Sequence, residues 1–423
     1  MKEDLLQYIW QFQYFNLNNL ATTDNSILQV IHPGTKNYNA GPDFKEAKIK
    51  IGDTMWAGNV ELHVNSSDWM HHRHHDDENY HHVILHVVWK ENRMINDLYG
   101  NTIPTLELCD KVPKILLDKY QGLMNATGFI PCENQLPKIQ LLTWMGWKER
   151  LLAERLTKKA DKALNVLKEN GYHWEETFWI LVASNFGVNV NSMFFENIAR
   201  FTPQKILARH RSSIHQLEAL LFGQAGLLNQ KFADKYPAML QKEYTFLQKK
   251  YNLQSPPGIA VFLRMRPANF PTIRLAQLAM LIFNSQHLFS QVKEATELNE
   301  LKKMFTLQAN DYWNYHYVFE EEAPFRRKTL GSQMIWNILI NTVIPVIFAY
   351  GKANNENEFK EKAIRWIEEV PKEKNRVTKE FERLGFQNSN AGDSQALLEL
   401  KKEYCDKKKC LHCTIGSIIL KRN

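Results

Sequence analysis

The spacing of hydrophobic residues changes part-way along the chain. Up to about residue 135, short apolar runs alternate with turn signals, and five runs have the character of β-strands: "ILQVIHPG", "AKIKIG", "WAGNVELHV", "HHVILHVVW" and "TIPTLEL". A broad apolar face between Leu5 and Phe15 predicts a helix before them. From about residue 139 the apolar residues follow the helical period, as in Leu152, Leu156 and Leu167, and Gly171 fits a helix C-cap.

This change of period predicts an α+β protein. We expect an N-terminal α/β domain with a small mixed sheet at 1–138, an all-α domain at 139–350, and a charged helical segment with a cysteine tail at 351–423. In the helical region, Gly187, Gly223 and Gly226 are expected to permit close helix packing. Its asparagine-rich stretch "SNFGVNVNSMFF" indicates helix caps or, alternatively, a ligand surface.

Composition narrows the class of protein. The chain has 423 residues, of which 44% are hydrophobic, so it can build a sizeable core. It shows neither a run of eighteen apolar residues nor a basic and apolar N-terminal signal, so we expect a cytoplasmic protein without a membrane partner. The net charge of +7 is compatible with a nucleic-acid partner without requiring one. The five cysteines do not suggest a disulfide framework.

The stretch "GNVELHVNSSDWMHHRHHDDENYHHVILHVVW" contains eight of the fifteen histidines. Alternation along a strand puts Glu61 and His63 on one face, and His86 on one face of the later strand. Asp43 follows a Gly-Pro turn, at the mouth of the strand "FKEAKIKI". Carboxylates bind hard divalent cations, and imidazole suits zinc, manganese, iron or nickel.

A metal site is therefore one hypothesis for this stretch. Asp43, Glu61 and His63 would form its centre, and a bound ion would activate water. Further candidate ligands are His72, His74, Asp77 and His86. The alternative is a polar strand face and a solvated histidine-rich loop without chemistry.

The C-terminal stretch "YCDKKKCLHCTIG" holds Cys405, Cys410 and Cys413 in a C-x4-C-x2-C pattern. This spacing is similar to that of plant-type ferredoxins, which use a distant fourth cysteine, and Cys132 is available for that role. Zinc is the other candidate, with Cys132 or His412 as fourth ligand. A reduced, metal-free tail remains a third interpretation.

Several motifs together resemble an uncharacterised bacterial family, domain of unknown function 2851. They are "GPDF", "VELH", "SSDW", "VILHVVW", "IPTLEL", "FGVNVN", "EALLFGQAGLL", "NFPTIRLAQLA" and the cysteine tail, and the likeness runs from about residue 5 to 417. No activity is implied by this resemblance.

The N-terminal layout also resembles the core of the PD-(D/E)xK nuclease superfamily. Pro42-Asp43 corresponds to its Pro-Asp element and Glu61-Leu62-His63 to its acidic-x-Lys element, with histidine in place of lysine. The resemblance implies a metal-dependent nuclease in which Asp43 and Glu61 bind Mg²⁺ or Mn²⁺ and His63 orients or deprotonates the water. Some nucleases of this group carry an iron–sulfur cluster held by one upstream and three C-terminal cysteines, which the cysteine tail is similar to.

Under this hypothesis the helical domain would hold the nucleic-acid backbone. Candidate phosphate contacts lie in "RMRPANFPTIR": Arg264, Arg266, Asn269 and Arg274. The alternative for this stretch is an exposed loop before a helix that begins near Pro271. Two other functions remain open: a nucleic-acid-binding or assembly module without turnover, and a histidine/carboxylate metalloenzyme with a small-molecule substrate.

Overall fold

The computed structural model describes residues 1–97, 99–136 and 139–421 and divides the chain into two compact units. The N-terminal unit comprises Met1–Thr143 and the C-terminal segment from Lys401, and the helical unit comprises Trp144–Leu400. The fold is α+β with a mixed N-terminal sheet, as the sequence predicted. Lys138, the predicted end of the first domain, lies outside the described residues. Residues 351–400 belong to the helical unit, whereas the cysteine tail belongs to the N-terminal unit.

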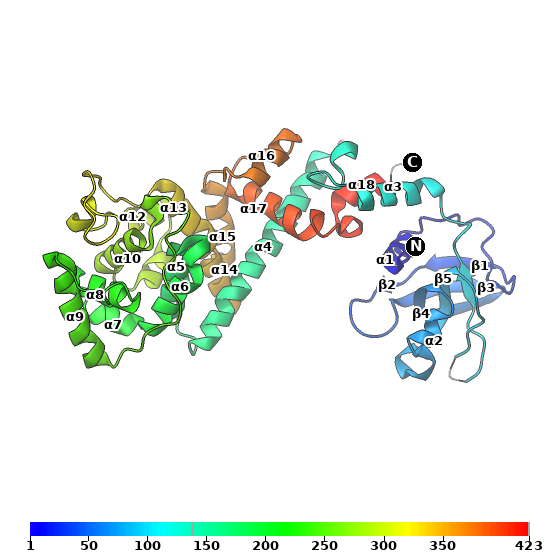
Figure 1. Cartoon of the computed structure of the whole chain (residues 1–423). Helices are drawn as coiled ribbons and strands as arrows, with labels where there is room; N and C mark the ends of the chain where they lie inside the picture. The colour runs from blue at the N-terminus through cyan, green and yellow to red at the C-terminus, as the bar shows by residue number, and fades with distance from the viewer. Residues whose placement is uncertain (98, 137–138, 422–423) are drawn as a thin grey trace. The chain divides into compact units, whose positions relative to one another are not determined.

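The N-terminal unit is built on one mixed sheet (Figure 1). Strands β3, β4, β5 and β6 coincide with four of the predicted runs, and β1 with the fifth. The elements are α1 (Glu3–Gln11), β1 (Leu28–His32), β2 (Thr35–Lys36), β3 (Phe44–Ile51), β4 (Thr54–Asn65), α2 (Asp68–His71), β5 (Val83–Lys90), β6 (Thr105–Glu107), α3 (Lys114–Asn125) and α18 (Thr414–Lys421).

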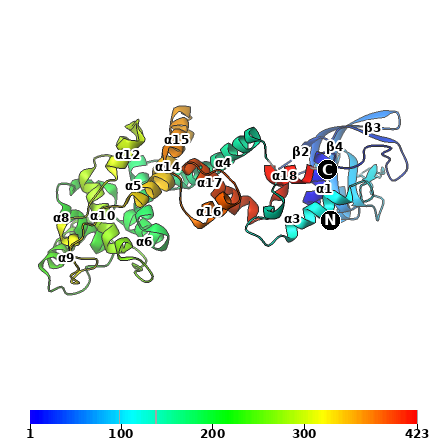
Figure 2. The same cartoon turned by 90° about the horizontal axis from the view of Figure 1, so that it is seen from above.

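The sheet order is β1-β3-β4-β5-β6, with β2 paired to β3. Strands β1, β3 and β4 are antiparallel neighbours, whereas β4–β5 and β5–β6 pair in parallel. One face carries a hydrophobic core in which Leu6 and Trp10 of α1 pack with Leu62 of β4 and Leu85 of β5. Figures 1 and 2 both show α3 beside α18, so the C-terminal helix packs against an element almost three hundred residues earlier in the chain.

The helical unit contains α4 to α17, and its first helix begins just before the unit. Their bounds are α4 (Leu141–Glu169), α5 (Trp174–Phe186), α6 (Val188–Phe201), α7 (Gln204–Arg209), α8 (Ile214–Gln224), α9 (Lys235–Tyr251), α10 (Pro271–Asn284), α11 (Leu288–Glu294), α12 (Leu298–Met304), α13 (Ser332–Ile338), α14 (Ile344–Ala353), α15 (Asn357–Glu369), α16 (Arg376–Arg383) and α17 (Ala391–Glu399). Gly171 lies two residues after the end of α4 and has φ +63°, the left-handed conformation typical of a glycine that ends a helix.

Helices α13 and α14 are continuous through a π-helical turn at Leu339–Val343, two residues before Pro345. A proline inside a helix removes one backbone donor, and a π-helical turn accommodates the disturbed hydrogen bonding. The stretch Ser332–Ala353 is long and apolar enough to cross a membrane, but 72% of its most apolar window is buried inside the protein. That burial accounts for its composition.

Candidate metal centre

The histidine-rich stretch forms the connection between β4 and β5. Parallel neighbouring strands need a crossover connection, because the chain must return to the starting edge before it can run in the same direction. Residues 66–82 make this return through α2 and two short 3₁₀ turns. Glu61 pairs with His86 across the two strands, so their side chains share a face with His63. The crossover therefore carries its histidines to the polar face of β4.

Three imidazoles and one carboxylate meet on that face. Nε2 of His63 lies 3.1 Å from Nδ1 of His72 and 3.8 Å from Oε1 of Glu61. Nε2 of His74 lies 3.4 Å from the same Glu61 oxygen. One ligand atom from each of the three histidines falls within 4.8 Å of the other two. These separations place three imidazole ligand atoms around one point, with a Glu61 carboxylate oxygen close to two of them.

The backbone of the crossover explains why both His72 and His74 reach this point. His72 caps the C-terminal end of α2, and the next residue, Arg73, has φ +58°, in the left-handed region. This turn redirects the chain so that His74 opens a 3₁₀ turn beside His72. The ring of Tyr80 stacks on His74 with centroids 3.8 Å apart, and the buried Trp69 meets His74 edge-on.

His86 lies behind this group rather than in it. Its Nε2 is 2.8 Å from Nδ1 of His63, and its Nδ1 is buried without a hydrogen-bond partner among the described residues. When Nδ1–H of His63 donates to His86, Nε2 of His63 keeps its lone pair directed to the other ligand atoms. His86 is therefore placed to fix the tautomer of His63.

Asp43 holds Glu61 in position. Its backbone N–H donates to Oε2 of Glu61 over 2.9 Å, which leaves Oε1 facing the imidazoles. The Asp43 carboxylate itself accepts from Gln7 Nε2 at 2.7 Å and from the Leu62 backbone N–H at 3.2 Å. One predicted ligand, Asp43, is thus already hydrogen-bonded through both oxygens, and the free carboxylate oxygen belongs to Glu61.

The pKa values in the cluster are those of buried ionisable groups that have no positive charge beside them. Burial raises the pKa of Glu61 to about 9 and that of Asp43 to about 6, and the negative charge of Asp43 adds to the rise at Glu61. Burial lowers the pKa of His63 to about 2 and that of His74 to about 4, and neighbouring histidines add to both effects. A bound divalent cation would favour carboxylates and neutral imidazoles, which is the form that ligands must take.

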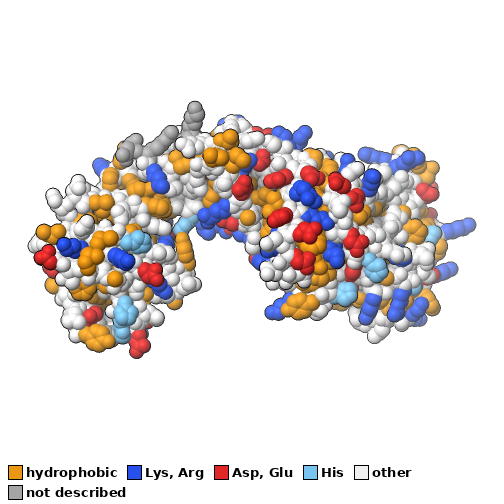
Figure 3. All heavy atoms as spheres, turned by 180° about the vertical axis from the view of Figure 1, so that it is seen from behind, with side chains coloured by type: hydrophobic (Ala, Val, Ile, Leu, Met, Phe, Trp, Pro, Cys, Tyr) orange, Lys and Arg blue, Asp and Glu red, His pale blue; other side chains and the backbone are white. Residues whose placement is uncertain are grey.

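The cluster opens to solvent on one side. Glu61 and His63 are only 4% and 1% exposed, whereas His72 is exposed and His74 is half-buried. Figure 3 shows histidine side chains at the surface of the N-terminal unit. A small ligand or an ion can therefore reach the group from the side of the crossover.

The predicted ligands divide into three sets. Glu61, His63, His72 and His74 come together, while His86 and Asp43 support them from behind. Asp77 instead accepts from the backbone N–H of Asn79 over 2.9 Å and caps a 3₁₀ turn.

Sequence reasoning missed three supporting residues: Gln7, Trp69 and Tyr80. Glu3, whose pKa burial and Asp43 raise to about 7, lies four residues before Gln7 on α1. The i, i+4 spacing of these two polar residues on one face of the helix was the available signal for Gln7.

The three thiols of the cysteine tail form one electrostatic group with the thiol of Cys132. Burial raises the pKa of Cys132 to about 12, and the negative charges of Cys413 and Cys410 add to the rise. Burial also raises the pKa of Cys405, with contributions from the other three. The cysteines form no disulfide.

Helix α18 begins directly after Cys413 and gives the tail a tight turn. Backbone N–H groups of Ile415 and Gly416 donate to the Cys413 sulfur and lower its pKa, although burial outweighs them and the net pKa is raised. A Cβ atom at Gly416 would lie 2.1 Å from the carbonyl oxygen of Cys410, so only glycine fits this position. Among the described residues, Cys109 is grouped with Glu107 and Asp110 as ligand atoms within 4.8 Å of one another, whereas Cys132, Cys405, Cys410 and Cys413 are in no such group. Their four sulfurs would therefore need to approach one another to hold one ion.

The predicted phosphate contacts are only partly brought together. Arg264 and Arg266 are exposed in the loop before α10, whereas Arg274 is buried on α10 and donates to Oδ1 of Asn269 over 2.5 Å. Helix α10 begins at Pro271, as the sequence indicated.

Fold and cluster together define an α+β protein with a histidine- and carboxylate-rich centre on the sheet of its first unit. The family model "Protein of unknown function (DUF2851)" matches residues 3–376, and the chain belongs to this family. No curated protein and no solved structure matches the chain. The order of a helix, strands, a short helical crossover and a further strand is present, but the resemblance to PD-(D/E)xK nucleases is not confirmed.

Proposed function

We propose that the N-terminal unit is a metal-dependent hydrolase whose substrates are phosphodiesters, nucleic acid first among them. The observation that carries the proposal is that ligand atoms of His63, His72 and His74 lie within 4.8 Å of one another, with Glu61 Oε1 at 3.8 Å from His63 Nε2 and 3.4 Å from His74 Nε2. Three imidazoles and a carboxylate suit manganese, iron or zinc better than magnesium. This donor set replaces the Asp43–Glu61 pair that the sequence favoured for Mg²⁺ or Mn²⁺.

A metal ion in this position supplies a water of lowered pKa and polarises a phosphoryl oxygen. The protein's own part is to hold and orient. Asp43 fixes Glu61 through its N–H, and His86 fixes the ring of His63. Such supporting residues orient the ligands and raise their basicity. The net charge of +7 favours approach of a polyanionic substrate.

Metal content and hydrolysis test the proposal in sequence. Metal-stripped protein would be reloaded with Mn²⁺, Zn²⁺ or Mg²⁺, and bound metal would be quantified by elemental analysis. We expect about one equivalent of Mn²⁺ or Zn²⁺ and a loss of affinity of at least about 100-fold in His74→Ala, above the range reached by residues that only support ligands. His71→Ala is the matched control, because the side chain of His71 is 74% exposed on the same loop.

The loaded protein would then be offered single- and double-stranded DNA, RNA and bis(p-nitrophenyl) phosphate. Cleavage that His74→Ala abolishes and His71→Ala preserves would support the phosphodiesterase. Failure of wild type to bind any of the metals would end the proposal.

A second candidate is a metalloenzyme acting on a small molecule at the same centre. The number of imidazoles favours it, because imidazole suits zinc, copper, iron and nickel, whose sites serve many hydrolytic and oxidative reactions. Stoichiometric metal without cleavage of any phosphodiester would select this candidate over the nuclease.

We also propose that Cys132, Cys405, Cys410 and Cys413 hold zinc or an iron–sulfur cluster and so tie the end of the chain to the N-terminal unit. The other thiols raise the pKa values of Cys132 and Cys405, and backbone N–H groups donate to the Cys413 sulfur; both observations support this proposal. An ion would deprotonate the thiols and add its binding energy to folding. Anaerobic purification followed by metal analysis tests this proposal. Brown protein that contains iron would identify an iron–sulfur cluster, and one equivalent of zinc beyond that of the metal centre would identify a zinc site. Absence of both metals would reject the site. The thiol of Cys109 donates a hydrogen bond to Oε1 of Glu107 over 2.9 Å instead. Cys109→Ser leaves the four proposed ligands in place and is therefore the matched control for Cys410→Ser.

A further inference from the structure

The helical unit contains a basic pocket that the metal centre does not use. A cavity of about 460 Å³ lies beside α10 and α13 and the segment 326–331 between them. Four cationic side chains line it: Arg274, Arg326, Arg327 and Lys328. The other polar lining side chains are amides, a hydroxyl and a phenol, and no Asp or Glu of the described chain is among the lining residues.

Arg274 is the unusual member of this group. It is only 6% exposed, and its partners are the neutral amides of Gln277, at 2.9 Å, and Asn269, at 2.5 Å. Its Nε is buried without a hydrogen-bond partner among the described residues. A buried guanidinium is costly unless an anion compensates it, and burial alone lowers its pKa to about 10.

Lys328 adds a second uncompensated charge. It is 5% exposed, lies 3.9 Å from the ring centroid of Tyr317, and donates to the carbonyl oxygens of Arg326 at 3.0 Å and Asn314 at 3.4 Å. Burial lowers its pKa, and the positive charge of Arg326 lowers it further. In the described part of the unit, none of the four cations forms an ion pair.

Some cations of the same unit that are less buried than Arg274 and Lys328 do have carboxylate partners. Arg155 and Lys158 pair with Glu399, and Lys148 pairs with Asp393 over 2.5 Å. Arg274 and Lys328 are more deeply buried than these three side chains, yet no described carboxylate forms an ion pair with either of them. The absence of carboxylates around Arg274 indicates that an anion from outside completes this site.

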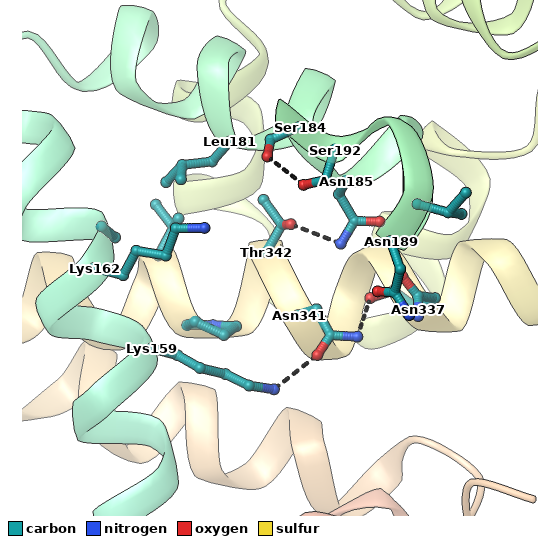
Figure 4. Close-up of a pocket in the computed structure, with 14 residues that line it drawn as sticks. Lys159, Lys162, Leu181, Ser184, Asn185, Asn189, Ser192, Asn337, Asn341 and Thr342 are labelled. Atoms are coloured by element: carbon teal, nitrogen blue, oxygen red, sulfur yellow. Dashed lines mark hydrogen bonds between the residues drawn. The ribbon is translucent and has the colours of Figure 1, made fainter. Parts of the chain in front are cut away.

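A second cavity adjoins the first and shares Val188 and Asn337 with it. Figure 4 shows Lys159 and Lys162 on one wall, opposite Asn341 and Thr342 of the π-helical turn. Burial, assisted by the charge of Arg155, lowers the pKa of Lys159 to about 7.

No Asp or Glu of the described residues lines this second cavity either. Val188, where the two cavities meet, has φ +48°, a conformation that is strained for a β-branched residue and typical of functional positions.

We propose that these joined cavities bind a ligand with two or more phosphate groups, and that Arg274 and Lys328 hold one phosphate at the buried end. Guanidinium groups bind phosphate with paired hydrogen bonds, and lysine adds a point charge. Arg326 and Arg327, which are exposed, stand at the entrance. The site is independent of the metal centre, so either proposal can fail alone.

Calorimetric titration of the whole protein with inorganic pyrophosphate tests the site. We expect one site per chain, weakened at least about 10-fold in Arg274→Gln, because a hydrogen bond to a charged group contributes about 1.5–3 kcal/mol. Arg327→Gln is the second variant, because its exposed side chain can be changed without disturbing the core. We expect it to weaken binding about 2- to 5-fold. Arg209→Gln, an exposed arginine of α7 outside the pocket, is the matched control and should change nothing.

Competition identifies the source of the phosphates. Displacement of pyrophosphate by a single-stranded oligonucleotide, but not by a mononucleotide, would assign the pocket to the nucleic-acid backbone. Displacement by a mononucleotide at equal concentration would assign it to a free nucleotide. Absence of pyrophosphate binding, or equal binding by wild type and both pocket variants, would overturn the proposal.

Discussion

The two units contain charge imbalances of opposite sign. Around Glu61 and His63, buried carboxylates have raised pKa values and imidazoles have lowered ones, so this cluster lacks a cation. Around Arg274 and Lys328, buried cations have lowered pKa values and no carboxylate, so this pocket lacks an anion. In both places, ionisable groups are buried without an oppositely charged partner, which costs free energy. That cost is the physical reason to expect a ligand.

A third buried group shows why a shifted pKa alone does not indicate a ligand. Burial raises the pKa of Glu218 in α8 to about 7, as it raises that of Glu61. However, Glu218 accepts hydrogen bonds from the hydroxyl of Tyr236 and from Nε1 of Trp313, the latter at 3.1 Å. Its oxygens are satisfied from within the fold, whereas Oε1 of Glu61 faces imidazoles at 3.4 and 3.8 Å. The difference in partners separates a structural carboxylate from a candidate ligand.

The largest effect on stability that we predict concerns this structural carboxylate. The folded-state pKa of Glu218, about 7, is above the ordinary value of 4.5, so the folded protein holds this proton more tightly than the unfolded chain does. Protonated Glu218 therefore contributes stability that is fully present below about pH 4.5 and is lost as the pH rises through about 7. We expect wild type to lose about 2–3 kcal/mol relative to Glu218→Gln between pH 5 and pH 7.5.

Equilibrium urea unfolding at the two pH values measures this difference. Glu321→Gln, which changes an exposed carboxylate of the same unit, serves as the control and should follow wild type. If the stability of Glu218→Gln shows the same pH dependence as that of wild type, the buried carboxylate is not the group that titrates. Glu218 could then no longer serve as the structural carboxylate with which Glu61 is compared.

The next effect tests whether His86 supports the metal centre from behind. Its Nε2 is 2.8 Å from His63, and we expect His86→Asn to weaken Mn²⁺ or Zn²⁺ binding about 10- to 100-fold, the range for residues that orient a ligand. His82→Asn, on the same segment but exposed, should leave binding unchanged. Complete loss of metal would instead make His86 a ligand, and unchanged affinity would remove its supporting role.

The same pair of variants sharpens the comparison between the units. Neither should alter pyrophosphate binding, because Arg274 and Lys328 belong to the other unit. A change in pyrophosphate affinity in His86→Asn would mean that the two imbalances are coupled.

Local periodicity predicted the fold and part of the cluster. Alternation placed Glu61 and His63 on one strand face, and helical spacing found α4 and α10. It could not predict which loop histidines point inward, because that depends on the left-handed turn at Arg73 and on the parallel pairing of β4 with β5. An unbranched residue such as arginine can occupy a left-handed turn at a modest cost, and the sequence carries no sign of that turn.

The basic pocket was harder to foresee, because its residues are spread along the chain. Arg274 and Asn269 were candidates from one segment, whereas Lys328 comes from another segment more than fifty residues later. What distinguishes the pocket is the absence of carboxylates around buried cations, and only tertiary structure reveals that absence. Arg264 and Arg266 looked equivalent to Arg274 in the sequence, yet they are exposed in the loop.

The smallest effect we predict is at the entrance of the pocket. Arg326 is exposed, so replacing it by glutamine should weaken pyrophosphate binding no more than about 5-fold, as is usual for exposed charges. Because salt screens exposed charges more than buried ones, this contribution should disappear at about 1 M salt, while that of Arg274 should persist. Titrations of Arg326→Gln and Arg274→Gln at low and high salt measure both terms. Equal salt sensitivity of the two variants would show that Arg274 is not the buried end of the site, and would remove the contrast in burial on which the comparison rests.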